Sequence, residues 1–87
     1  MHIKQGFVMR EVAGQHVAIA TGEASKAFHG MVKLNGTGAF IWRGVEKGQD
    51  AAAIAQGLAD AYDVELAKAK ADVDAFIASM SDKGFLE

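Results

Sequence analysis

The sequence predicts an α+β fold in which three strands come first and three helices follow. Up to about residue 34, short apolar runs are interrupted by glycines at positions 14, 22 and 30. Beyond that point the chain is rich in alanine, and its apolar residues recur at helical spacing. The chain has 87 residues, of which 51% are hydrophobic. This length predicts a single domain over residues 1–87 with one core.

The expected strands span residues 7–12, 16–20 and 31–34. The first two form a hairpin whose turn is Ala13-Gly14-Gln15, because glycine readily takes a positive φ. In the second strand Val17 and Ile19 share one face. Residues 21–29 are predicted as a polar loop with Phe28 tucked inward. Three strands are about the minimum for a stable sheet, and a helix must then cover one face.

The expected helices span residues 36–43, 51–62 and 65–83. Asn35 and Asp50 precede the first two, and both are residue types whose side chains cap free N–H groups of the first turn. Gly44 and Gly84 are expected to end the first and third helices in the left-handed conformation. Phe85-Leu86 then fold back onto the core.

Apolar stripes on the second and third helices are expected to form most of the core. Trp42 and Phe76 are also assigned to the core, since an aromatic residue in an apolar helix is usually buried. On the second helix the stripe comprises Ile54, Leu58, Ala61 and Tyr62. On the third helix it comprises Leu66, Ala69, Val73, Phe76, Ile77 and Met80.

Composition excludes several classes of protein. The chain lacks cysteine, which rules out disulfides and thiolate metal sites. His2, His16 and His29 share no metal-binding spacing, and we expect no metal or other cofactor. No run of about 18 apolar residues occurs, so we expect no membrane association and a cytoplasmic location. The net charge of −2 argues against binding nucleic acid through bulk charge.

Arrangements typical of catalysis are missing from the sequence. The serines have no evident histidine partner. Gly36-Thr37-Gly38 lacks the lysine and the preceding strand of a phosphate-binding loop. Asp72 and Asp74 lie two residues apart on a predicted helix and point to different faces, which prevents them from acting as a paired acid and base. We therefore expect the chain not to be an enzyme.

Two stretches carry a resemblance to a known family. The first is KLNGTGAFIW at 33–42. The second is Tyr62-Asp63-Val64, followed at matching spacing by Asp72-Val73, Phe76, Met80 and residues 84–87. In joint order and spacing they resemble the PqqD-like family, the leader-recognition elements of peptide-maturation pathways. The resemblance covers about residues 7–87. Gly36 departs from the family pattern, which often has glutamate there, and we expect this to affect stability rather than function.

The resemblance implies a winged-helix-like fold and a non-catalytic role. A precursor peptide made by ribosomes would add its leader as an antiparallel strand to the exposed edge of the third strand. Its side chains would enter a groove between that strand and the third helix. The partner implied is a radical S-adenosylmethionine enzyme, to which the domain would present the precursor. The resemblance requires no cofactor on this chain.

The residues expected to form the peptide site are Met31, Val32, Lys33, Leu34, Lys70, Val73, Asp74, Ile77, and Met80 or Ser81. Alternation places Met31 and Lys33 on one strand face and Val32 and Leu34 on the other, and the sequence leaves open which pair packs on the helices. Lys33 fits either a peptide contact or a solvated lysine that blunts an edge. Lys33, Lys70 and Asp74 would select charges on the peptide. So short an edge predicts micromolar affinity, about −8 kcal/mol.

Three other functions remain open from the sequence. A winged helix can bind DNA, but residues 48–67 contain four acidic and no basic residues, whereas a helix facing phosphates should be basic. The same strand edge also suits a protein-interaction module without a peptide substrate. Homodimerisation through the open edge is compatible with any of these roles.

Overall fold

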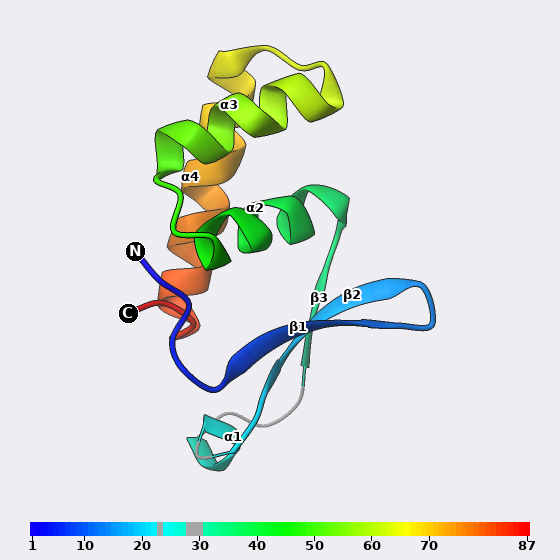
Figure 1. Ribbon diagram of the computed structural model, residues 1–87, viewed down its shortest axis with the longest axis vertical. Helices are drawn as coiled ribbons and strands as arrows, with labels where there is room; N and C mark the ends of the chain where they lie inside the picture. Colours follow the sequence, from blue (N-terminus) through cyan, green and yellow to red (C-terminus); the bar gives the residue numbers. More distant parts are fainter. Residues whose placement is uncertain (23, 28–30) are drawn as a thin grey trace.

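A computed structural model describes residues 1–22, 24–27 and 31–87. The elements in chain order are β1 (Phe7–Val12), β2 (Gln15–Ala20), α1 (Ala24–Ala27), β3 (Met31–Leu34), α2 (Gly36–Glu46), α3 (Ala51–Tyr62) and α4 (Leu66–Asp82). The predicted α+β order of three strands followed by three helices is confirmed. The short helix α1 lies within the segment predicted as a loop, and Phe28 is outside the described residues. Figure 1 shows α2 between the sheet and α3, with α4 passing behind both.

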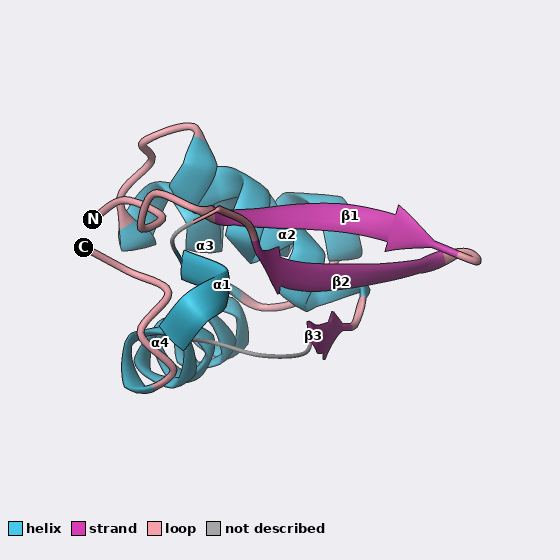
Figure 2. Cartoon of the chain, turned by 90° about the horizontal axis from the view of Figure 1, so that it is seen from below, coloured by secondary structure: helices cyan, strands magenta, loops and turns pink. Residues whose placement is uncertain are grey.

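The sheet is antiparallel with strand order β1-β2-β3. Val12 pairs with Gln15, leaving Ala13 and Gly14 as a two-residue loop. Both loop residues have positive φ, 53° and 79°, which is the type I′ turn that suits the twist of a hairpin. The predicted hairpin is confirmed. In Figure 2 β3 lies beyond β2, on the side of the sheet toward α4.

The core consists of two adjoining clusters of buried side chains. One cluster joins the three long helices through Ile41, Val45, Ile54, Ala55, Leu58, Ala59, Ala69 and Val73. The other joins the sheet to the helices through Phe7, Ala18, Leu34, Trp42, Met80 and Phe85. Phe76 is half-buried and packs against both clusters. Trp42 is fully buried, so its assignment to the core is confirmed.

The two ends of the chain pair with each other. Ile3 and Leu86 form an antiparallel bridge, and the backbone N–H of Lys4 donates to the carbonyl of Phe85 at 2.7 Å. Phe85 is buried, as predicted, and its ring meets the indole of Trp42 edge-on at 5.5 Å. This pairing holds the C-terminal residues against the sheet-side cluster, with the two ends close together in Figure 1.

The predicted caps are confirmed. The Asn35 side chain accepts a hydrogen bond from the Gly38 N–H at 2.7 Å, and the Asp50 side chain accepts one from the Ala53 N–H at 2.8 Å. Gly84, just after α4, has a φ of +80°. These local features begin α2 and α3 and end α4 where the sequence places them.

Two expectations about the helices are wrong. Gly44 does not end α2, which continues to Glu46; the left-handed glycine that follows is Gly48, with a φ of +80°. Gly44 is buried, and a Cβ atom there would lie 2.7 Å from Ile54 Cγ1. Its role is therefore close packing of α2 on α3. Ala61, Tyr62 and Leu66, predicted as core, are exposed because they lie at the end of α3 and the start of α4, which α2 covers only in part.

Candidate functional site

The strand β3 has a free edge in the described sheet, as predicted. Because the two-residue hairpin loop closes on Val12 and Gln15, these residues exchange both backbone hydrogen bonds, and bonded pairs alternate from there. Residues 16 and 18 of β2 consequently direct their backbone groups at β3, where their partners are Leu34 and Val32. The N–H and C=O groups of Met31 and Lys33 therefore point outward, away from β2.

Successive side chains of β3 point to opposite faces of the sheet. Leu34 is buried and Val32 is half-buried against the sheet-side cluster. Met31 is 58% exposed, and Lys33 is also exposed. The pair that packs on the helices is thus Val32 and Leu34, which decides the alternative left open by the sequence.

A hollow, termed here the β3–α4 groove, runs between β3 and α4. Both of its parts are lined by Lys33, Leu34, Phe76 and Ser79. The inner part has a volume of about 190 Å³ and is completed by Val32, Trp42, Met80, Lys83 and Phe85. The outer part has a volume of about 540 Å³ and is completed by Asn35, Thr37, Ile41, Lys68, Asp72 and Ala75. A peptide in extended conformation that paired with the β3 edge would lie beside this groove.

The groove has an apolar floor and a mostly cationic rim. Lys33 stands on the strand side and Lys83 at the inner end. The Lys83 ammonium donates to the hydroxyl of Ser79 at 2.9 Å. At the outer end Lys68 forms an exposed ion pair with Asp72, with a distance of 2.7 Å between Nζ and Oδ1. This rim favours an apolar ligand that carries acidic groups at its margins.

Trp42 forms part of the inner floor of the groove and is the single tryptophan of the chain. Its Nε1–H is buried and has no hydrogen-bond partner. Buried donors are nearly always paired, so such a group is unusual in a folded protein. Because the indole lines the inner part of the groove, its N–H group reports on what enters there.

The predicted strand residues of the site lie where expected, while the predicted helix residues mostly do not. Val32, Lys33, Leu34 and Met80 line the groove, and Met31 lies on the free edge. Contact of any of these residues with a peptide remains a prediction.

Lys70, Val73, Asp74 and Ile77 are not among the described residues that line the groove. Val73 is fully buried among the helices, and Ile77 packs against the same helical cluster. Lys70 and Asp74 are exposed on other faces of α4. Contact of these four residues with a peptide remains a prediction, and the described lining of the groove does not include them.

The physical reason is the rotation of α4 about its axis. The lining residues of α4 include Lys68, Asp72, Phe76 and Ser79, which recur at spacings of three and four and share one face, and Lys83, just after the helix, continues that spacing. Val73 and Ile77 of the predicted wall lie one position further along than Asp72 and Phe76, about 100° around the helix. The polar residues of this face lie on one helical stripe together with the apolar Phe76. A stripe that mixes polar and apolar residues was the sequence signal that could have identified this wall of the groove.

Neither a metal site nor a membrane span finds support in the described part of the chain. Within residues 1–22, 24–27 and 31–87, no group of histidine and carboxylate side chains is arranged to hold a metal ion. None of the described helices is both long and apolar enough to cross a membrane.

Comparison with known proteins agrees with this geometry. The family model described as coenzyme PQQ synthesis protein D (PqqD) matches residues 8–86. The structure of TbiB1 in complex with the TbiA(beta) leader peptide is similar over 100% of this chain and 95% of that chain, with a TM-score of 0.81 and 21% identity. Lasso peptide synthetase B1 complexed with the leader peptide gives 99% and 95% coverage, a TM-score of 0.80 and 22% identity. A search of curated proteins gave no significant match.

Proposed function

This chain belongs to the PqqD family, and we propose that it is a non-catalytic domain, spanning residues 1–87, that captures the leader of a ribosomally made precursor peptide. The observation that carries the proposal is the free edge of β3 beside an open groove. The two similar solved structures support it, since both are complexes with leader peptides.

Capture proceeds by strand addition. The leader lies antiparallel to β3 and pairs with the outward N–H and C=O groups of Met31 and Lys33. Backbone bonds supply affinity, while alternate side chains of the leader supply specificity by entering the groove. Since β3 has only four residues, the isolated domain binds with micromolar affinity, about −8 kcal/mol.

The groove selects the side chains of the leader. Its inner part is floored by Val32, Phe76 and Met80 and accepts one apolar side chain. Methionine adapts its shape to different occupants. Lys33 and Lys83 at the rim favour an acidic residue close to that apolar one.

The chemistry on the precursor belongs to a partner, a radical S-adenosylmethionine enzyme. By holding the leader, the domain raises the local concentration of the precursor at that enzyme, an effect of tethering that needs no cofactor on this chain. Duplex DNA is a poor alternative ligand, because α3 contains no basic residue and Lys68 on α4 is paired with Asp72. A homodimer formed through the β3 edge would compete with the peptide for the same backbone groups.

An amide NMR titration with the leader of its precursor peptide tests the proposal. We expect the largest shifts at residues 31–34 and on the groove face of α4, together with a shift of the single indole N–H resonance of Trp42. Duplex DNA of mixed sequence is the control and should cause no shifts. Shifts on α3 and α4 with DNA, and none with the leader, would overturn leader capture. Sedimentation of the free domain separates edge-to-edge dimers from peptide binding.

A further inference from the structure

A second hollow lies between α2 and α3 and shares no lining residue with the β3–α4 groove. This α2–α3 cleft has a volume of about 300 Å³. On one side it is lined by Phe40, Arg43 and Gly44 of α2 and by Lys47, the residue that follows α2. Gln49 of the connection, with Ala53 and Gly57 of α3, completes the lining. The groove instead uses Thr37 and Ile41 of α2. The two hollows therefore lie on different faces of α2, and filling one leaves the other open.

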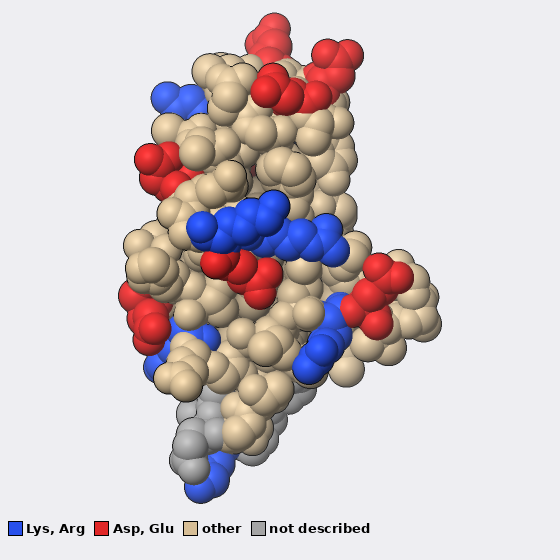
Figure 3. Space-filling model, viewed as in Figure 1, with Lys and Arg blue, Asp and Glu red and all other residues tan. Residues whose placement is uncertain are grey.

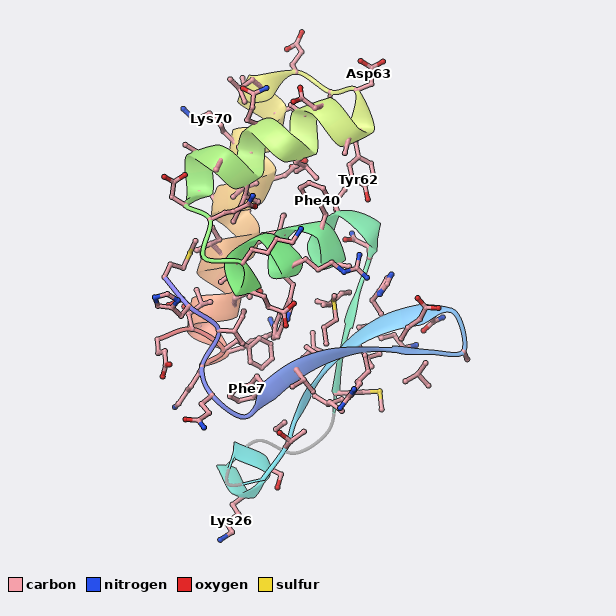
Figure 4. All side chains as sticks on the ribbon, in the orientation of Figure 1. Phe7, Lys26, Phe40, Tyr62, Asp63 and Lys70 are labelled. Carbon is pink, nitrogen blue, oxygen red and sulfur yellow. The ribbon has the colours of Figure 1, made fainter. Side chains whose placement is uncertain are left out.

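Glycines shape the cleft. Gly44 allows α3 to approach closely, and a Cβ atom on Gly57 would lie 3.2 Å from Cζ of Phe40. The ring of Phe40 thus sits over the bare backbone of α3 at this point. It also meets the ring of Tyr62 edge-on, with 6.1 Å between the ring centres. Figure 4 shows these two aromatic side chains pointing toward each other between α2 and α3.

The charged side chains described in the lining of the cleft are basic. Among the described residues that line it, Arg43 and Lys47 are the charged ones, and both are exposed. Neither side chain forms an ion pair with any described residue. Figure 3 shows basic side chains lying across the middle of this face, over α2, with acidic side chains directly beside this band and others at the tip where α3 connects to α4. A cleft with two unpaired cations and an aromatic wall is electrostatically complementary to carboxylates.

Apolar surface continues from the cleft toward that tip. Tyr62 is 44% exposed, and Val64 and Leu66 are exposed to a similar degree. Tyrosine, phenylalanine and arginine are among the residue types enriched at protein interfaces. The surface therefore has the composition of a docking site, with an apolar part and a cationic part side by side.

We propose that the α2–α3 cleft docks an acidic segment of the partner enzyme, with carboxylates at Arg43 and Lys47 and an apolar side chain against Phe40. That the partner is the maturation enzyme rests on the proposed function. That the cleft binds an acidic segment does not depend on it. Because the cleft and the groove are separate, the domain holds the leader and the enzyme at the same time. Presentation of the precursor requires this arrangement.

The first test uses a defined probe. The capped peptide acetyl-Gly-Asp-Phe-Glu-Asp-Gly-amide is titrated into the labelled domain to about 5 mM, a range that detects affinities near −4 kcal/mol. Its isostere with Asn and Gln in place of the acids is the control. We expect amide shifts at residues 40–49 and 53–57 with the acidic peptide alone. No shifts there, or equal shifts with the neutral peptide, would overturn the proposal.

The second test uses variants. Arg43→Gln with Lys47→Gln removes both charges and leaves polar, unbranched side chains that are somewhat shorter. Lys70→Gln removes an exposed cation outside both hollows. We expect the double variant to bind the acidic peptide, and the proposed partner enzyme, about tenfold more weakly, with an effect below about twofold for Lys70→Gln. Wild-type affinity in the double variant would exclude the cleft.

Leader binding is measured separately on the same samples through the amides of β3. The double variant should bind the leader as the wild type does, because neither residue lines the groove. Loss of leader binding in the double variant would overturn the independence of the two sites. Failure of the wild type to bind any leader, with the acidic peptide still bound, would refute the proposed function and leave the cleft intact.

Discussion

Replacing Lys33 with proline tests strand addition at its most specific point. The register of the sheet directs the N–H of Lys33 outward, away from β2. Proline lacks this donor, and it is tolerated on edge strands whose N–H faces solvent. The residue before it, Val32, already lies in a strand, which is the conformation that a following proline favours. Lys33→Pro therefore removes a group that only the leader uses.

The magnitude follows from the hydrogen bond that is lost. A net backbone bond contributes about 0.5–1.5 kcal/mol, and a carbonyl of the leader left without its donor costs about 1–3 kcal/mol. The groove is open to solvent, so water partly restores that carbonyl and the lower half of this range applies. We expect a loss of about 1–2 kcal/mol, which is a 5- to 30-fold rise in Kd.

The assay is fluorescence anisotropy of a labelled leader, accompanied by urea denaturation of each variant. Lys33→Ala removes the side chain and keeps the N–H, which separates the rim charge from the backbone bond. Val32→Pro is the contrasting variant, since the N–H of Val32 points at Ala18 of β2 and its loss should destabilise the sheet. The reasoning is refuted if Lys33→Pro keeps its stability and binds the leader as tightly as Lys33→Ala.

Three further predictions concern the scaffold, and denaturant or thermal unfolding checks each of them. Gly44→Ala should destabilise the fold by about 1–3 kcal/mol, because the new Cβ meets Ile54 at 2.7 Å and this outweighs the gain in helix propensity; a more stable variant would contradict the close packing of α2 on α3. Ala13→Asn should stabilise by about 0.5–1 kcal/mol, since asparagine before Gly14 suits the type I′ turn where alanine has a φ of 53°, and lower stability would refute this. Asn35→Ala should cost about 1 kcal/mol through loss of the N-cap, whereas an unchanged midpoint would show that the cap is dispensable.

Most of the fold was predictable because its signals are local. Helix caps at Asn35 and Asp50 depend on side chains that reach only a few residues, and the hairpin depends on one turn. Gly44 shows the limit of such reasoning. A glycine that ends a helix and a glycine that admits a neighbouring helix look identical in the sequence, and the contact with Ile54 on α3 alone distinguishes them.

The exposed position of Tyr62 was missed for a related reason. It continues the apolar stripe of Ile54 and Leu58, and periodicity alone treats all three alike. Burial depends instead on which neighbour covers each turn. At the end of α3, Tyr62 meets the half-buried ring of Phe40 and lies close to Gly36, and this partial cover leaves it 44% exposed.

The strand half of the groove was predictable and the helix half was not, and the difference is one of symmetry. A strand has two faces, so alternation restricts the residues of β3 to two choices, and burial of Leu34 decides between them. On α4 a wall of the groove can begin at any position, and a change of one residue turns it by about 100°. Val73 and Asp72 are neighbours in sequence, yet one is fully buried and the other lines the groove. Substitutions that probe leader binding on α4 should therefore target Phe76 and Ser79, while changes at Val73 report only on stability.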